Sequence, residues 1–214
     1  MPRIKVCGLT RYEDAALAAE LGAWGLGFIF TELSPRSCST EVAADIIRRL
    51  DADGAKVEKV GVFLNESATN INAVAENVGI TVAQMHGNET ADECRQVNIQ
   101  VLKAIQELDW ADTAVLDAYQ PHMLLMDAPR VGDKYGGTGH KADWEQASKI
   151  AASYPLFLAG SLSADNIVEA LETVRPMGAD LSSSLEASHG IKDPVKIRRL
   201  FEVLEQSALL ENQH

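Results

Sequence analysis

The feature of this sequence that most constrains its fold is an eightfold alternation of a short apolar run with a segment of helical spacing. Each run has the length of a buried strand, and the segments between them carry apolar residues every three or four positions, as amphipathic helices do. The carboxyl ends of the first and last expected strands, near Cys7 and Ser182, lie 175 residues apart, which is seven intervals of 25. The expected strands are 4–7, 25–30, 60–64, 81–85, 100–105, 123–126, 155–159 and 179–181.

Eight strand-then-helix units, with no Pro/Ser-rich linker between them, predict an α/β fold and in particular a (β/α)₈ TIM barrel. We expect one barrel domain over residues 1–214, with the last few residues frayed. A doubly wound open sheet is the alternative, but two of the eight expected strands would then have to be wrong.

Several helix starts are predicted by their capping residues. Residues 10–13, 90–93 and 143–146 each begin with Thr or Asp and end with Glu or Gln, the spacing of a capping box. Ser163 is expected to cap the seventh helix, and Asp193 followed by Pro194 is expected to open the last one.

Composition excludes some classes of partner. The chain has 19 basic and 31 acidic residues and a net charge of −12, which disfavours binding to nucleic acid or to an anionic membrane. No apolar run approaches membrane-spanning length, and the first residues lack the apolar stretch of a signal peptide. The three cysteines are widely spaced and odd in number, so we expect reduced thiols in a cytoplasmic protein.

Cys7 is the first candidate for chemistry. It ends the first expected strand, and ligands of α/β barrels bind at the carboxyl ends of the strands. The alternative interpretation is a small buried apolar residue, which describes most free cysteines.

Three more chemistry-bearing side chains follow expected strands. Asp127 follows the sixth expected strand, and we interpret an acid at this position as catalytic. A helix cap or a structural ion pair is the alternative interpretation. Arg36 can grip a carboxylate with two parallel hydrogen bonds, or it can be merely solvated. His86 follows the fourth strand, where a structural histidine is equally compatible with the sequence.

Small residues follow the other strands. The loop Gly136-Gly-Thr-Gly139 lacks the pattern of a P-loop or a dinucleotide fingerprint, so we interpret it as a loop that closes over a ligand. Gly160-Ser161 and the serines 182–184 follow strands seven and eight, where barrels commonly bind phosphate with backbone amides and a helix N-terminus.

Taken together, these motifs resemble the phosphoribosylanthranilate isomerase family from Ile4 to the region of Pro194. The matching segments are Lys5-Val-Cys-Gly-Leu-Thr10, Ser34-Pro-Arg36, Gln84-Met-His-Gly87, Asp127 with Gly136-Gly-Thr-Gly139, and Asp180-Leu-Ser-Ser183.

The resemblance implies a (β/α)₈ barrel that acts as monomer or homodimer. The implied reaction is the conversion of N-(5-phosphoribosyl)anthranilate, a small phosphosugar, to 1-(2-carboxyphenylamino)-1-deoxyribulose 5-phosphate, the third step of tryptophan biosynthesis, without a cofactor or metal. It implies Cys7 as general base, Asp127 as general acid, and Arg36 as the residue that holds the anthranilate carboxylate. The further expected substrate-binding residues are His86, Gly137, Gly160, Ser161, Ser183 and Ser184.

This chain departs from the family at two positions in the expected phosphate loops. Ser161 and Ser184 stand where the family usually has glycine. Because Gly160 beside it can adopt an unusual angle, we expect Ser161 to have an ordinary backbone conformation, whereas Ser184 has no such neighbour.

Two other functions remain open from the residues alone. One is a thiol hydrolase that uses Cys7, His86 and Asp127, and the other is a barrel that binds phosphosugars without turnover.

Overall fold

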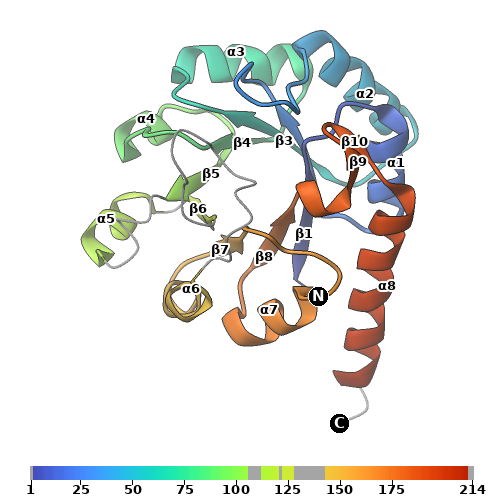
Figure 1. Ribbon diagram of the computed structural model, residues 1–214. Coiled ribbons are helices and arrows are strands. Elements are labelled where there is room, and N and C mark those ends of the chain that lie inside the picture. The colour runs from blue at the N-terminus through green and yellow to red at the C-terminus, as the bar shows by residue number, and fades with distance from the viewer. Residues whose placement is uncertain (1, 106–111, 121, 128–142, 212–214) are drawn as a thin grey trace.

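The computed structural model describes residues 2–105, 112–120, 122–127 and 143–211 of the 214-residue chain. Its central feature is a closed barrel in which eight strands follow one another in chain order, each parallel to the next, and the last pairs with the first (Figure 1). The eight strands are β1 (Arg3–Cys7), β2 (Gly25–Ile29), β3 (Glu58–Phe63), β4 (Val82–Met85), β5 (Gln100–Ile105), β6 (Met123–Met126), β7 (Leu156–Leu158) and β8 (Gly178–Leu181). The predicted barrel is therefore confirmed, and the open sheet is wrong.

Helices surround the barrel, as Figure 1 shows. The helices are α1 (Tyr12–Glu20), α2 (Thr40–Ala52), α3 (Ala68–Val78), α4 (Ala91–Arg95), α5 (Thr113–Ala118), α6 (Trp144–Ala151), α7 (Ile167–Val174) and α8 (Pro194–Glu211). None of the helices in the described part of the chain is both long and apolar enough to cross a membrane.

One segment, with three short elements, was not expected. Between β8 and α8 the chain forms a 3₁₀ turn, η2 (Ser183–Leu185), and then an antiparallel hairpin of β9 (Glu186–Ser188) and β10 (Ile191–Lys192). In Figure 1 this hairpin lies beside α1, near the carboxyl end of β1.

The apolar core has two parts, because successive strand residues point to opposite faces of the barrel. The larger part packs the outer face of the barrel against the helices and includes Ile4, Val6 and Leu181. The smaller part fills the inside, and its members come from alternate strand positions: Val60, Val82, Leu102, Ala104, Met123, Leu125, Phe157 and Ala159.

The same alternation assigns polar residues to the inside at one end of the barrel. Lys5 and Cys7 alternate with the outward-facing Ile4 and Val6 on β1, and Asp180 alternates with the outward-facing Leu181 on β8. By the same count Asp127, which follows β6, takes an inward position above Leu125. The carboxyl ends of the strands thus gather charged groups over an apolar interior.

Three capping predictions are confirmed. Helix α8 begins at Pro194, and Asp193 before it accepts the Val195 N–H at 2.9 Å. Thr90 Oγ1 accepts the Glu93 N–H, and the Glu93 carboxylate accepts the Thr90 N–H in return, so α4 begins with a complete capping box. Asp143 caps α6 by accepting the Gln146 N–H at 3.0 Å.

Two other capping predictions are wrong. The residue at the N-cap of α1 is Arg11, without a side-chain cap, because the Thr10 hydroxyl donates instead to the Gly190 carbonyl in the β9–β10 hairpin. Helix α7 begins at Ile167, later than expected, and Ser163 accepts the Asp165 N–H in the turn before the helix.

Candidate active site

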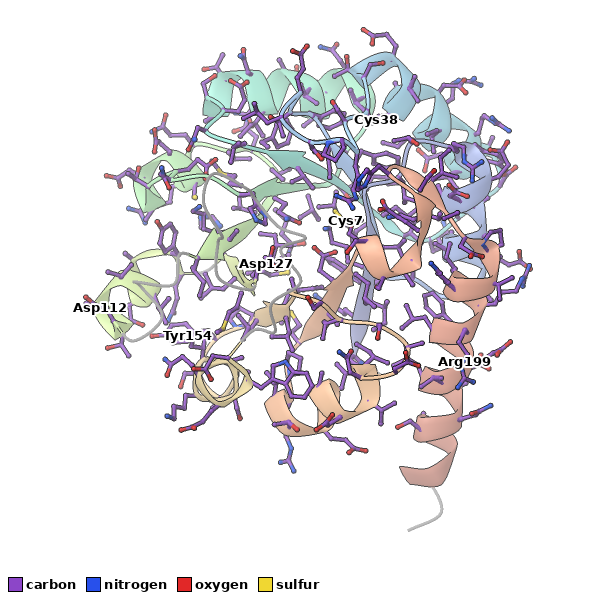
Figure 2. All side chains as sticks on the ribbon, in the orientation of Figure 1. Cys7, Cys38, Asp112, Asp127, Tyr154 and Arg199 are labelled. Atoms are coloured by element: carbon purple, nitrogen blue, oxygen red, sulfur yellow. The ribbon has the colours of Figure 1, made fainter. Side chains whose placement is uncertain are left out.

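Cys7 lies at the carboxyl end of β1 with 5% of its surface exposed. Its partner across the strand pair is Gly27 of β2, and a Cβ on Gly27 would come within 2.7 Å of the Cys7 sulfur. The missing side chain on β2 therefore makes the space that the thiol occupies. Figure 2 shows Cys7 and Asp127 toward the middle of the barrel, whereas Asp112 and Arg199 lie at its outside.

Three charged groups act on the Cys7 thiol. Burial raises the pKa of Cys7, the positive charge of Lys5 opposes that rise, Asp180 adds to it, and Lys192 opposes it. The thiol therefore sits in a dry site that disfavours its ionised form, with two ammonium groups working in the other direction.

Lys5 is completely buried and forms an ion pair with Asp180. Its Nζ donates to both carboxylate oxygens of Asp180 at 2.9 Å, and the two residues are register partners on β1 and β8. Burial alone would lower the pKa of Lys5, but the charges of Asp180 and Cys7 outweigh it and the pKa is raised. Lys5 is thus held as an ammonium inside the barrel.

Lys192 reaches the same region from the hairpin. Its Nζ donates to the Ser182 carbonyl at 3.0 Å and to Glu186 Oε1 at 3.2 Å. Burial lowers the pKa of Lys192, and Glu186 and Cys7 oppose that shift.

Arg36 points its paired donors at a protein carboxylate. Its Nε and Nη2 donate to the two oxygens of Glu186 at 2.7 and 2.8 Å, and Nη2 also lies 3.3 Å from His189 Nδ1. Burial alone would raise the pKa of Glu186, but Arg36 and Lys192 outweigh it and hold that pKa below its usual value. A substrate carboxylate would therefore bind through Nη1, the guanidinium nitrogen that Glu186 does not engage.

His86 and Asp127 come together at the carboxyl ends of β4 and β6. His86 Nε2 lies 3.8 Å from Asp127 Oδ2, and both side chains are about one-fifth exposed, at 19% and 20%. On the other side of the ring, His86 Nδ1 lies 2.9 Å from the side-chain nitrogen Nε2 of Gln84. Asp127 is thus partly open to a ligand at the barrel mouth.

A buried ion pair behind His86 fixes the loop that carries it. Lys103 Nζ donates to the carbonyls of Met85 and Gly87 and to Glu89 Oε2 at 3.2, 2.7 and 2.9 Å. Glu89 in turn accepts the Gly87 N–H. Both partners are at least 95% buried, so the loop after β4 is a rigid support.

The expectation for Ser161 is wrong. Gly160 has φ +88°, and Ser161 has φ +53°, so both residues are left-handed. The side chain of Asn166 holds this turn, because its Nδ2 donates to the Ser161 carbonyl at 3.0 Å while its Oδ1 accepts the Ser163 N–H at 2.8 Å. The turn requires a positive φ at Ser161 as well as at Gly160. Ser161 therefore carries backbone strain of about 1–2 kcal/mol.

Ser183 and Ser184 open the turn η2 after β8. Ser184 is not one of the described residues with a positive φ. Its hydroxyl oxygen is buried and has no hydrogen-bond partner among the described residues. The expected loop Gly136–Gly139, including Gly137, lies outside the described residues.

Sequence reasoning missed the charged groups behind the expected catalytic ones. Lys5 and Asp180 belong to segments that resemble the family, but no role was predicted for them. A charged residue within an expected buried strand is the feature of the sequence that could have identified both. Glu186 and Lys192 flank a His-Gly turn in strands of three and two residues, which are too short for a periodic pattern.

Comparison with known proteins agrees with this geometry. Residues 4–203 match the family model described as N-(5'phosphoribosyl)anthranilate (PRA) isomerase. An N-(5'-phosphoribosyl)anthranilate isomerase of Syntrophus aciditrophicus is 43% identical over 199 residues, which cover 92% of this chain and 85% of the relative.

Solved structures of isomerases are also similar to this chain. The phosphoribosyl anthranilate isomerase of Thermotoga maritima is 34% identical with a TM-score of 0.86, over 96% of this chain and 100% of that one. A phosphoribosyl anthranilate isomerase in complex with reduced 1-(o-carboxyphenylamino)-1-deoxyribulose 5-phosphate is 32% identical with a TM-score of 0.83, over the same shares of the two chains. The chain belongs to the N-(5'-phosphoribosyl)anthranilate isomerase family of enzymes.

Proposed function

We propose that this protein converts N-(5-phosphoribosyl)anthranilate to 1-(2-carboxyphenylamino)-1-deoxyribulose 5-phosphate, in tryptophan biosynthesis, with no cofactor. Membership of the isomerase family supports this activity. The observation that carries the proposal is that a thiol and a carboxyl group, Cys7 and Asp127, take inward positions at the carboxyl ends of β1 and β6.

The first chemical step needs an acid, and we assign it to Asp127. Its carboxyl group donates a proton to the furanose ring oxygen as the bond from that oxygen to C1 breaks. The lone pair of the anthranilate nitrogen forms the C=N bond of the open-chain iminium ion. The partial exposure of Asp127 leaves it within reach of a bound substrate.

The second step needs a base, and we assign it to Cys7. Its thiolate takes the proton from C2, the C2–H electrons form a C1=C2 bond, and the C=N electrons return to nitrogen. The resulting enolamine tautomerises to the ketone product. A thiolate formed in a buried site is a strong base because its pKa is raised.

The remaining side chains supply binding. We assign the anthranilate carboxylate to Arg36, through the Nη1 that Glu186 does not engage, and His86 lies beside Asp127 at the barrel mouth. The turns after β7 and β8 supply backbone amides for phosphate, and the buried hydroxyl of Ser184 is available as a further donor. For Gly137 the proposal is that it contacts the substrate as part of the loop Gly136–Gly139, which we interpret as closing over the ligand.

At the level of the molecule, we infer a single barrel domain over residues 1–214 that acts in the cytoplasm as a monomer or homodimer. One similar solved structure is of monomers generated from the dimeric phosphoribosylanthranilate isomerase of Thermotoga maritima, which keeps both states open.

The test is direct conversion of the substrate. Freshly prepared phosphoribosylanthranilate should lose its fluorescence faster with the protein than without it, and mass spectrometry should find an isomer of unchanged mass that is stable to mild acid. Binding of the product without accelerated loss of substrate would support a non-catalytic barrel instead. Release of an acid from ester substrates with trapping of an acyl-enzyme on Cys7 would support the thiol hydrolase.

A further inference from the structure

Two ammonium groups are buried around Cys7, which is unusual because a lysine side chain is almost never fully buried without a compensating partner. Lys5 lies two residues before Cys7 on the inward face of β1 and is 0% exposed. Lys192 comes from β10 and is 1% exposed. The proposed acid and base steps do not use either of them.

Each ammonium is anchored by a carboxylate. Lys5 donates to both oxygens of Asp180, and Lys192 donates to Glu186, which is also paired with Arg36. These carboxylates fix the two lysines in place, and Lys5 also hydrogen-bonds the Cys7 side chain. They form a preorganised positive environment.

Within the part of the chain that the structure describes, three strands bring charged groups to the thiol. The strand β1 presents Lys5, β8 presents Asp180, and β10 presents Lys192. On the remaining side β2 presents only Gly27, which has no side chain. Lys5 also hydrogen-bonds the Cys7 side chain, whereas Asp180 acts on the thiol only through its charge, so the ion pair as a whole favours ionisation of the thiol.

We propose that Lys5, held by Asp180, is a positioning residue that stabilises the Cys7 thiolate inside the barrel, and that Lys192 assists it from the hairpin. The proposal rests on the proposed function, in which the thiolate is the base. The thiol proton is lost to solvent, and both ammonium groups keep their protons throughout. Their charge replaces the water that would solvate a thiolate at the surface.

This arrangement predicts shifts of opposite sign in two related variants. In Lys5→Gln/Asp180→Asn the ion pair becomes a neutral amide pair, so the pKa of Cys7 rises. In Asp180→Asn the carboxylate that opposes ionisation is removed, and the Cys7 thiolate becomes the partner that holds Lys5 as an ammonium, so the pKa of Cys7 falls. A merely structural role for the pair would not give opposite signs.

The measurement is a pH titration of the protein labelled with ¹³C at the cysteine Cβ. The signals of Cys38 and Cys94 are assigned with Cys38→Ala and Cys94→Ala, and burial raises the pKa of each of these two thiols to about 11. Circular dichroism at each pH confirms that the variant is folded. Should Lys5→Gln/Asp180→Asn fail to fold, Lys192→Gln provides the same test, because it also removes a positive charge and must raise the pKa of Cys7.

The kinetic readout follows the titration. At neutral pH, kcat/KM falls by up to about tenfold for each pH unit by which the thiol pKa rises, because less thiolate is present. In Asp180→Asn it should rise in the same proportion. KM for the substrate should change less than kcat, since neither Lys5 nor Asp180 is assigned to substrate binding.

A second buried ion pair supplies the matched control. Lys103 and Glu89 are also paired at 2.9 Å and buried, but their charges act on Cys94. In Lys103→Gln/Glu89→Gln the titration of Cys7 should therefore stay in place.

Shifts of the same sign in both test variants, no shift, or an equal shift in the control would overturn the proposal. These results are distinct from failure of the proposed function, because the thiol titration is read without substrate. Absence of isomerisation in the unmodified protein would end the assignment of Cys7 as base and with it the catalytic meaning of any shift.

Discussion

The thiol of Cys7 occupies space that a glycine on the neighbouring strand leaves empty. Gly27 faces Cys7 in register, and any larger residue there would place its Cβ 2.7 Å from the sulfur and 3.0 Å from the Cys7 Cα. Real Cβ atoms do not approach so closely, so either the thiol or the strand has to move. At this scale, the position of the proposed base depends on the absence of one methyl group.

We therefore expect Gly27→Ala to lower kcat by about 10- to 100-fold, because a displacement near 1 Å is enough to disturb proton transfer. Steady-state kinetics measures the effect. Gly25→Ala is the matched control on the same face of β2, since its Cβ would lie 3.3 Å from a methyl group of Val60 and 3.7 Å from Glu58, with no contact as short as the one to the Cys7 sulfur. Equal activity of the two variants would show that the Cys7 thiol needs no such space.

Ser161 gives a second prediction at the level of one residue. Its φ of +53° costs about 1–2 kcal/mol for a residue with a Cβ, whereas glycine avoids that cost but loses about 0.5–1 kcal/mol through its freedom in the unfolded chain. Ser161→Gly should thus raise the free energy of unfolding by up to about 1 kcal/mol in urea denaturation. Ser161→Ala keeps the Cβ and should bring no such gain; a gain in the alanine variant alone would contradict the strain.

At the scale of elements, the sequence predicted best where periodic patterns are long. All eight barrel strands were predicted within one or two residues at most ends, because each is an apolar run such as Met123–Met126. The capping prediction at Thr10 failed because a distant carbonyl, that of Gly190, competes for its hydroxyl. Such competition between residues 180 positions apart leaves no mark in the local sequence.

The β9–β10 hairpin was missed for a related reason. Its short strands lack periodicity, and its role is to bring Glu186 to Arg36 and Lys192 toward Cys7. The catalytic candidates could thus be named from motifs, but their electrostatic surroundings required the fold.

The loop between β4 and α4 allows a prediction on stability. Lys103→Gln leaves Glu89 as a buried carboxylate without its ammonium partner, which should cost about 3–5 kcal/mol of unfolding free energy. Adding Glu89→Gln removes the unpaired charge and should recover part of that loss. Urea denaturation of both single variants and the double variant forms the cycle. Costs that simply add would show that the two groups do not interact.

At the scale of the whole molecule, the chain has a net charge of −12, whereas the proposed substrate carries a phosphate and a carboxylate. The buried lysines, Arg36 and the backbone amides of the last two loops concentrate positive potential at one end. Local arrangement, rather than overall charge, therefore decides what the site can bind.

The pH dependence of kcat/KM is a property of this whole site. The active form carries a proton on Asp127 and none on Cys7, so the profile should be bell-shaped. Its alkaline limb reports the Cys7 pKa, which burial raises above the ordinary value of 9.0, and the limb should therefore lie above pH 9.0. A descending limb centred near neutral pH would contradict the assignment of Cys7.

The most direct test of the account compares the rate of phosphoribosylanthranilate isomerisation in the unmodified protein, Cys7→Ser, Asp127→Asn and the control Cys38→Ser. Each site variant should lose about 10²–10⁴-fold in kcat while still binding the product in calorimetric titration, because general acid–base catalysis is lost and the binding groups remain. Cys38 is buried in the core under the outer face of the barrel, so its variant should keep its turnover if it is folded. Turnover within a few-fold of the unmodified protein in either Cys7→Ser or Asp127→Asn would contradict the assignment of that residue and with it the mechanism.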